Sequence, residues 1–191
     1  GAARLGSRRI VALAERYGIE TARAVSRAMY DTYHEIDRVV RSEGIDAQWK
    51  EGGSLRLARG EHERPSIEGG FQAAQKLGLG DHYQLLNAQQ TADMVRVTDV
   101  VAGLYNPTAA SIHPARLARG LARTIEADGA TIYEQTPVTD FEGGAKPRLI
   151  TPYGDVRAKT VVLAGEAYSQ QLPKLERTIV PMYSLIVLTE P

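Results

Sequence analysis

Three side chains carry groups that could take part in chemistry, one at a predicted helix start and two in predicted strands. His113 stands directly before Pro114, and an imidazole can exchange a proton near neutral pH. The alternative is that His113 only satisfies backbone groups at a helix start, because proline suits the first helical position. Tyr105 and Tyr183 fall in predicted strands and could line a small-molecule pocket, although aromatic residues are common in strands that bind nothing. We therefore treat His113, Tyr105 and Tyr183 as candidate pocket residues.

Several other kinds of chemistry have no support in the residues. The sequence has no cysteine, which excludes disulfides, thiolate catalysis and cysteine-based metal sites. His34, His62 and His82 lie far apart and lack the spacing of metal ligands, so surface or capping roles are expected. No Ser/His/Asp constellation and no nucleophile elbow occur, so hydrolase chemistry is not indicated.

Composition narrows the class of protein and its partners. The chain has 191 residues, 43% of them hydrophobic, and a formal net charge of zero. That length allows one large domain or two small ones with a sizeable core. The balanced charge argues against nucleic acid as a partner. No apolar run reaches the roughly 18 residues that a membrane span needs, and the first residues lack the apolar core of a signal peptide. We expect a cytoplasmic protein.

The first part of the chain predicts helices followed by a mixed α/β segment. Apolar residues recur every three or four positions from 8 to 43, with a break at Gly18. Leu55 and Leu57 alternate with polar neighbours, as in a strand with one buried face. Further predicted elements are a helix at 61–79 interrupted at Pro65 and at Gly69-Gly70, a helix at 88–95 and a strand at 100–105.

The second part predicts a helix, a strand, a β-meander and two more strands. Pro114 begins a helix that Asp128-Gly129 ends, and 130–134 forms the next strand. Three short strands follow at 138–142, 148–151 and 155–158, separated by glycine-rich turns. The run 161–164 is uniformly apolar, as in a strand covered on both faces. A short helix after Gly165 and a strand at 179–189 complete an order that suggests two interleaved domains.

Five segments of the sequence carry a family resemblance, and they occur in the family's order. The run Ser111-Ile112-His113-Pro114-Ala115-Arg116-Leu117 resembles the G-x-I-H-P-x-x-L element of the D-amino-acid oxidase superfamily of FAD-dependent oxidoreductases. The other matching segments are 52–58, 129–138, 156–168 and 181–191. The subgroup that the chain resembles most is the γ-glutamylputrescine oxidase-like flavoproteins.

The resemblance implies a fold, a cofactor and a set of contact residues. It implies an α/β chain in which a partial FAD-binding α/β domain with a β-meander (1–43 and 113–175) is interleaved with a partial mixed-sheet substrate-binding domain (44–112 and 176–191). Val138 is the position whose backbone meets the adenine in relatives, and Ala164 and Gly165 form a turn near the adenosine. The expected reaction is hydride transfer from a C–N bond of an amine or amino acid to FAD.

The chain also departs from the family pattern. No Gly-x-Gly-x-x-Gly turn follows an apolar strand, and that turn is what cradles the cofactor pyrophosphate. We therefore expect a central fragment that is inactive by itself, does not retain FAD, and self-associates through unpaired sheet edges. Two alternatives stay open: a flavoprotein of the same fold that oxidises a hydroxy acid or another non-amine, and a non-catalytic module that has lost FAD.

Overall fold

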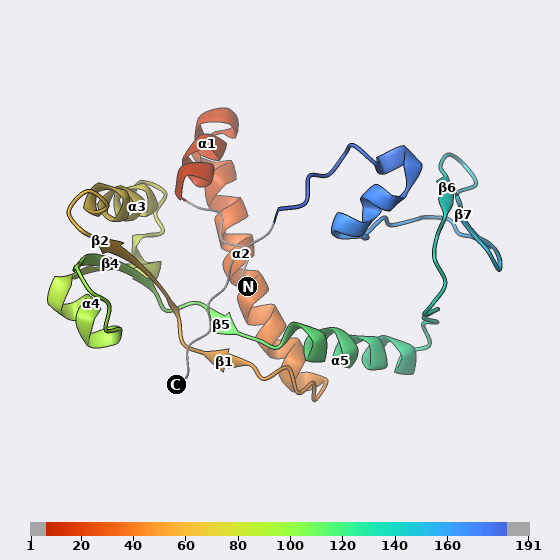
Figure 1. Cartoon of the computed structure of the whole chain (residues 1–191), viewed down its shortest axis with the longest axis horizontal. Coiled ribbons are helices and arrows are strands. Elements are labelled where there is room, and N and C mark those ends of the chain that lie inside the picture. The colour runs from red at the N-terminus through yellow and green to blue at the C-terminus, as the bar shows by residue number, and fades with distance from the viewer. Residues whose placement is uncertain (1–6, 183–191) are drawn as a thin grey trace. The chain divides into compact units, whose positions relative to one another are not determined.

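The computed structural model describes residues 7–182 (Figure 1). The chain divides into two compact units, Gly1–Ala130 and Thr131–Pro191, which we call unit 1 and unit 2. The strands at 100–105 and in the meander, and the helices on either side of Gly18, form as predicted. Each unit is described by itself below.

Unit 1 opens with two helices, α1 (Ser7–Tyr17) and α2 (Ile19–Ser42). They are separated at Gly18, whose φ of 87° lies in the left-handed region that glycine tolerates. Ala22 of α2 is fully buried against Leu77 and Leu79. The Nε of Arg23 also donates to the Leu77 carbonyl oxygen at 2.9 Å. Packing and hydrogen bonding together fix α2 to the segment that follows the third helix.

A three-stranded antiparallel sheet forms the centre of unit 1, in the order β2 (Ser54–Arg59), β4 (Val100–Asn106), β3 (Gln84–Asn87). Helices α3 (Arg64–Lys76) and α4 (Ala88–Met94) pack on its two faces (Figure 1). Ala102 and Leu104 cluster with Ile67 of α3. Gly103, between them, faces Thr91 of α4 so closely that a Cβ would lie 2.6 Å from the Thr91 hydroxyl. The period-2 alternation of β4 therefore places α3 and α4 on opposite sides.

Helix α3 corrects the prediction of an interruption at Gly69-Gly70. The helix runs through both glycines, and Gly70 is buried with Ile67 and Ala74 on the face toward the core. Glycine in a helix costs only about 1 kcal/mol relative to alanine, which the buried face offsets. Pro65 sits in the first turn, where its missing N–H does no harm. A 3₁₀ turn, η1 (Gly80–His82), leads from α3 to β3.

The last helix of unit 1, α5 (Pro114–Ala127), begins and ends where predicted. It follows a short two-stranded pairing of β1 (Lys50–Glu51) with β5 (Ala110–Ser111). Gly120 is the buried residue of α5, and a Cβ there would lie 2.2 Å from Ile45. Leu117 packs against the cluster of Val40, Ile45 and Ala47. The side chains of Leu121 and Ile125, four residues apart on α5, stay exposed.

Unit 2 contains the predicted meander, with strands β6 (Asp140–Glu142), β7 (Arg148–Thr151) and β8 (Gly154–Arg157). The short helix expected after Gly165 is a 3₁₀ helix, η2 (Glu166–Gln171), and a further turn, η3 (Pro173–Leu175), follows it. Lys174 of η3 lies 2.8 Å from the Asp140 carboxylate of β6. An ion pair thus joins the end of the described unit to the start of its sheet.

Two predicted strands and the start of a third do not form in the structure. Residues 130–134 and 161–164 have no strand pairing, and Tyr133 and Val162 are 71% and 81% exposed. A strand buried on both faces needs neighbouring strands and covering helices, and the described residues of unit 2 supply neither to these segments. Residues 179–182 are also irregular. The remainder of the strand predicted at 179–189 lies outside the described residues.

The mixed composition of helices and strands confirms the predicted α/β class. The assignment of 1–43 with 113–175 and of 44–112 with 176–191 to two interleaved domains stays a prediction. Among the described helices, none is long and apolar enough to cross a membrane.

Candidate functional site

Tyr105, a predicted pocket residue, covers the turn between β1 and β2. Gly53 has a φ of 70°, and a Cβ there would lie 2.4 Å from the Tyr105 hydroxyl oxygen. The hydroxyl donates a long hydrogen bond of 3.4 Å to the Gly52 carbonyl oxygen. This contact explains why position 53 is glycine: only glycine gives the turn its left-handed backbone there and leaves room for the phenol ring.

His113 caps the N-terminus of α5. The imidazole Nδ1 accepts the backbone N–H of Arg116 at 3.4 Å, and the backbone N–H of His113 donates to the Ala47 carbonyl oxygen at 2.8 Å. The imidazole is exposed. With Nδ1 as acceptor, Nε2 is the nitrogen that faces other partners and carries the proton of the neutral ring. The capping role is thus visible, and a role beside a substrate stays a prediction.

A polar cluster that the sequence did not reveal joins α2, η1 and β4. The rings of Tyr30 and His82 stack with centroids 4.0 Å apart and planes at 14°. The Asn106 side chain is buried, donates to the Tyr30 hydroxyl at 3.5 Å, and accepts the Thr108 N–H at 2.8 Å. His82 was expected only to cap a helix or to face solvent. No spacing along the chain marks three residues this far apart as neighbours.

A second aromatic group lies where α2 meets the segment before β1. Trp49 belongs to that segment. Its ring centroid lies 5.2 Å from that of Tyr33, and it packs against Val40, Ile45 and Ala47. Burial raises the pKa of Tyr33, and the nearby Glu51 carboxylate raises it further. Both effects favour the neutral phenol over the phenolate, and the Tyr33 hydroxyl donates a hydrogen bond to Glu51.

The three residues predicted to contact the cofactor lie in unit 2. Val138 is half-buried just before β6, and among the described residues its backbone N–H and C=O have no hydrogen-bond partner. Ala164 is exposed. Gly165 precedes η2, and a Cβ there would lie 2.7 Å from the buried Ser169 hydroxyl, so the tight turn itself requires glycine. Tyr183 lies outside the described residues.

These residues fit the adenosine portion of FAD in one respect. An adenine edge needs a backbone donor and acceptor with no internal partner, and Val138 offers both. Val138 and Gly165 are separate positions along unit 2, and the structure shows no contact between them. Among the described residues no group of histidine and acidic side chains could hold a metal ion.

The sequence belongs to a family of flavoenzymes. The family model described as FAD dependent oxidoreductase matches residues 5–191. This match confirms the resemblance to the D-amino-acid oxidase superfamily, whose members depend on FAD.

Among its relatives is the gamma-glutamylputrescine oxidoreductase of Escherichia coli (strain K12), 27% identical over 186 residues that cover 96% of this chain and 43% of the relative. The human mitochondrial dimethylglycine dehydrogenase is 25% identical over 170 residues, which are 84% of this chain and 19% of that protein.

Solved structures agree with this assignment. The glycine oxidase of Geobacillus kaustophilus superposes with a TM-score of 0.61 at 26% identity, over 80% of this chain and 40% of that one. The L-proline dehydrogenase of P. horikoshii has a TM-score of 0.64 at 20% identity and supports the fold alone. The chain thus spans less than half the length of these relatives.

Proposed function

We propose that this chain is part of an FAD-dependent oxidoreductase that oxidises a C–N bond of an amine or amino acid. The observation that carries the proposal is the family match along residues 5–191. The names of the relatives support the substrate class, since a putrescine derivative, dimethylglycine and glycine all contain an amine nitrogen.

The chemistry divides between cofactor and protein. Bound FAD would accept a hydride from the carbon next to the amine nitrogen, and the protein would supply binding and orientation. We assign the adenosine contacts to the backbone of Val138 and to the turn at Ala164 and Gly165. We assign Tyr105, Tyr183 and His113 to the substrate side. Because Nδ1 of His113 accepts from Arg116, the ring would donate from Nε2 to the substrate.

Assays of the full-length protein test the substrate class. Purified protein with bound flavin is mixed without oxygen with amines, amino acids and 2-hydroxy acids, and bleaching of the flavin absorbance is recorded. Reoxidation by oxygen or by an artificial dye then identifies the acceptor. We expect bleaching with an amine or amino acid. Bleaching by hydroxy acids alone would replace this reaction with the non-amine alternative.

We propose that the 191-residue chain by itself is inactive and does not retain FAD. Its predicted cofactor contacts are exposed or half-buried segments of unit 2, and the sequence offers no Gly-x-Gly-x-x-Gly cradle for the pyrophosphate. Adding the chain to micromolar FAD should leave flavin fluorescence unchanged. Stoichiometric quenching would show that the chain holds its cofactor. Failure of the full-length protein to bind FAD would instead favour the non-catalytic module.

We also propose that the isolated chain self-associates. Residues 130–134 and 161–164 take part in no strand pairing and carry exposed apolar side chains such as Tyr133 and Val162, and apolar segments of this kind can add to a sheet of another chain. Light scattering should give a mass above that of one chain at micromolar concentration. A monodisperse monomer over the same range would rule the proposal out.

For localisation we propose the cytoplasm, since a sequence without cysteine suits a reducing compartment. Fractionation of cells that express the full-length protein would test this, and recovery outside the cytoplasmic fraction would contradict it.

A further inference from the structure

A cavity of about 410 Å³ in unit 1 lies at the C-terminal turn of α2 and the segment up to Trp49. Its apolar lining comes from Val40, Ile45, Ala47 and the indole of Trp49, which also form one packed cluster. Arg41 and Asp46 supply charged side chains to the same cavity. An apolar surface with a few polar groups is the usual make-up of a small-molecule site.

Trp49, one of the lining residues, has a buried nitrogen that lacks the partner which buried polar groups normally have. The Nε1 of Trp49 is closed to solvent and has no hydrogen-bond acceptor, the only such buried side-chain atom among the described residues. Indole nitrogen is a donor only, so an acceptor must be brought to it. Buried donors without an acceptor are rare in folded proteins, and each requires an explanation.

The charged groups around the cavity decide which acceptor suits it. Asp37 accepts the Nε of Arg41 at 2.8 Å, and Asp46 is paired with Arg116. Both carboxylates are therefore neutralised by arginines. The two terminal nitrogens of Arg41 have no acceptor within the described residues. The charged and indole groups that remain unpaired are therefore donors, and one of them carries a positive charge.

We propose that this cavity binds a small carboxylate with an apolar body. The carboxylate accepts hydrogen bonds from the Trp49 indole and the free nitrogens of Arg41, and the hydrocarbon lies on Val40 and Ile45. Gln48 lines the cavity next to Trp49 in the chain and has a φ of 50°, a left-handed conformation that is unfavourable for glutamine. A move of Gln48 out of this conformation admits the ligand to the donor. The site requires no flavin and is independent of the proposed oxidation.

The chain offers a direct readout, because Trp49 is its only tryptophan. The ¹⁵N-labelled full chain gives a single indole N–H signal, which is followed during titration with butyrate, butyramide and n-butylammonium chloride. We expect a saturable downfield shift with butyrate and at least tenfold weaker binding of butyramide. Butylammonium should leave the signal in place.

Two variants separate the site from its surroundings. Arg41→Gln removes the charged donor and should weaken butyrate binding about tenfold, which corresponds to about 1.4 kcal/mol for the lost charge-assisted hydrogen bond. Arg38→Gln is the matched control, because Arg38 lies on the same helix in an exposed pair with Glu35 and does not line the cavity.

Three results would overturn the proposal. They are an unchanged indole signal up to 20 mM butyrate, equal shifts with butyrate and butylammonium, and equal weakening by the two arginine variants. A persistent cross-peak between the indole proton and water at saturating butyrate would show that an ordered water fills the position. The butyrate and butyramide ranking uses the unaltered chain and stands even where a variant fails to fold.

Discussion

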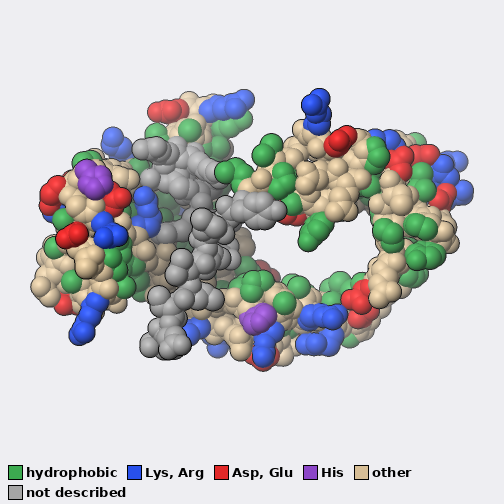
Figure 2. Space-filling view, viewed as in Figure 1, with side chains coloured by type: hydrophobic (Ala, Val, Ile, Leu, Met, Phe, Trp, Pro, Cys, Tyr) green, Lys and Arg blue, Asp and Glu red, His purple; other side chains and the backbone are tan. Residues whose placement is uncertain are grey.

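Units 1 and 2 are stabilised in different ways. Every buried hydrophobic residue among those described lies in unit 1, where three clusters join α2, α3, the sheet and the segment before α5. In the described part of unit 2 the buried residue is Ser169, and hydrophobic side chains lie at the surface (Figure 2). Unit 1 has its own core; unit 2 has a sheet without one.

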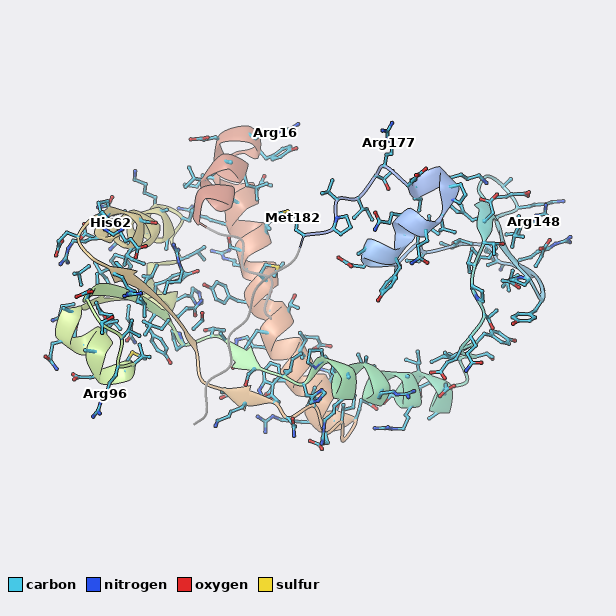
Figure 3. The ribbon with its side chains drawn as sticks, viewed as in Figure 1. Arg16, His62, Arg96, Arg148, Arg177 and Met182 are labelled. Atoms are coloured by element: carbon cyan, nitrogen blue, oxygen red, sulfur yellow. The ribbon has the colours of Figure 1, made fainter. Side chains whose placement is uncertain are left out.

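In unit 2 the strands are connected by ion pairs between exposed side chains and not by buried apolar residues. Arg148 of β7 contacts Glu142 of β6 and Asp155 of β8, each at 2.7 Å, and so links all three strands (Figure 3). Exposed pairs of this kind contribute little to stability and are screened by salt. The difference teaches that the sheet of the predicted substrate-binding part, 44–112, forms with covering helices within this chain. In the predicted FAD-binding part the meander pairs, but the strands predicted at 130–134 and 161–164 do not form.

The largest expected difference between the two units comes from truncating one apolar side chain in each. Leu104→Ala removes a fully buried side chain from unit 1 and should cost about 3 kcal/mol. Val162→Ala, at a position that is 81% exposed, should change stability by less than about 0.5 kcal/mol. Urea unfolding followed by circular dichroism measures both. A cost at Val162 close to that at Leu104 would mean that unit 2 buries this residue in solution.

Helical glycines provide a smaller test of the unit 1 core. Gly120→Ala places a methyl group 2.2 Å from Ile45, and the overpacking cost of about 1–3 kcal/mol exceeds the roughly 1 kcal/mol gained in helix propensity. Gly69→Ala in α3 meets nothing within 4 Å and should stabilise by up to about 1 kcal/mol. Thermal unfolding of both variants should therefore shift in opposite directions. A shift in the same direction would contradict the close packing of α5 on Ile45.

The elements that the sequence predicted well are those with local signals. Gly18, Pro114 and Gly129 mark helix ends by backbone conformation alone, and the meander is set by its turns. The strands at 130–134 and 161–164 depended on neighbours that periodicity along the chain does not contain. The same reason explains the error at Gly69-Gly70, since burial against the sheet outweighs the helix propensity of glycine.

For the candidate site, too, the sequence predicted local features and missed contacts between distant residues. A local motif, histidine before proline, located the cap of α5 correctly. The stack of Tyr30 on His82 and the unpaired indole of Trp49 arise from residues brought together by folding. Only the three-dimensional contacts reveal such groups, because their sequence separations carry no period.

The smallest effect concerns the pH dependence of the meander. Hydrogen bonds from Arg148 lower the pKa of Glu142, and Lys174 lowers the pKa of Asp140. A carboxyl with a lower pKa in the folded state stabilises that state above its ordinary pKa of about 4, and this contribution is lost as pH falls through the lowered value. The amide NMR signals of Leu149 and Ile150 should therefore broaden or move toward unfolded positions at a higher pH than that of Leu104.

Two controls sharpen this last test of the difference between the units. Glu142→Gln removes the titrating partner of Arg148 and should flatten the pH response of β7. Glu176→Gln should leave that response intact, because Glu176 is exposed and has no ion pair in the described structure. Sodium chloride at 0.5 M should weaken the meander at neutral pH, because the ion pairs are exposed. If the signals of β4 and β7 instead disappear together at every pH, the two units unfold as one, and the absence of a separate core in unit 2 has no energetic consequence.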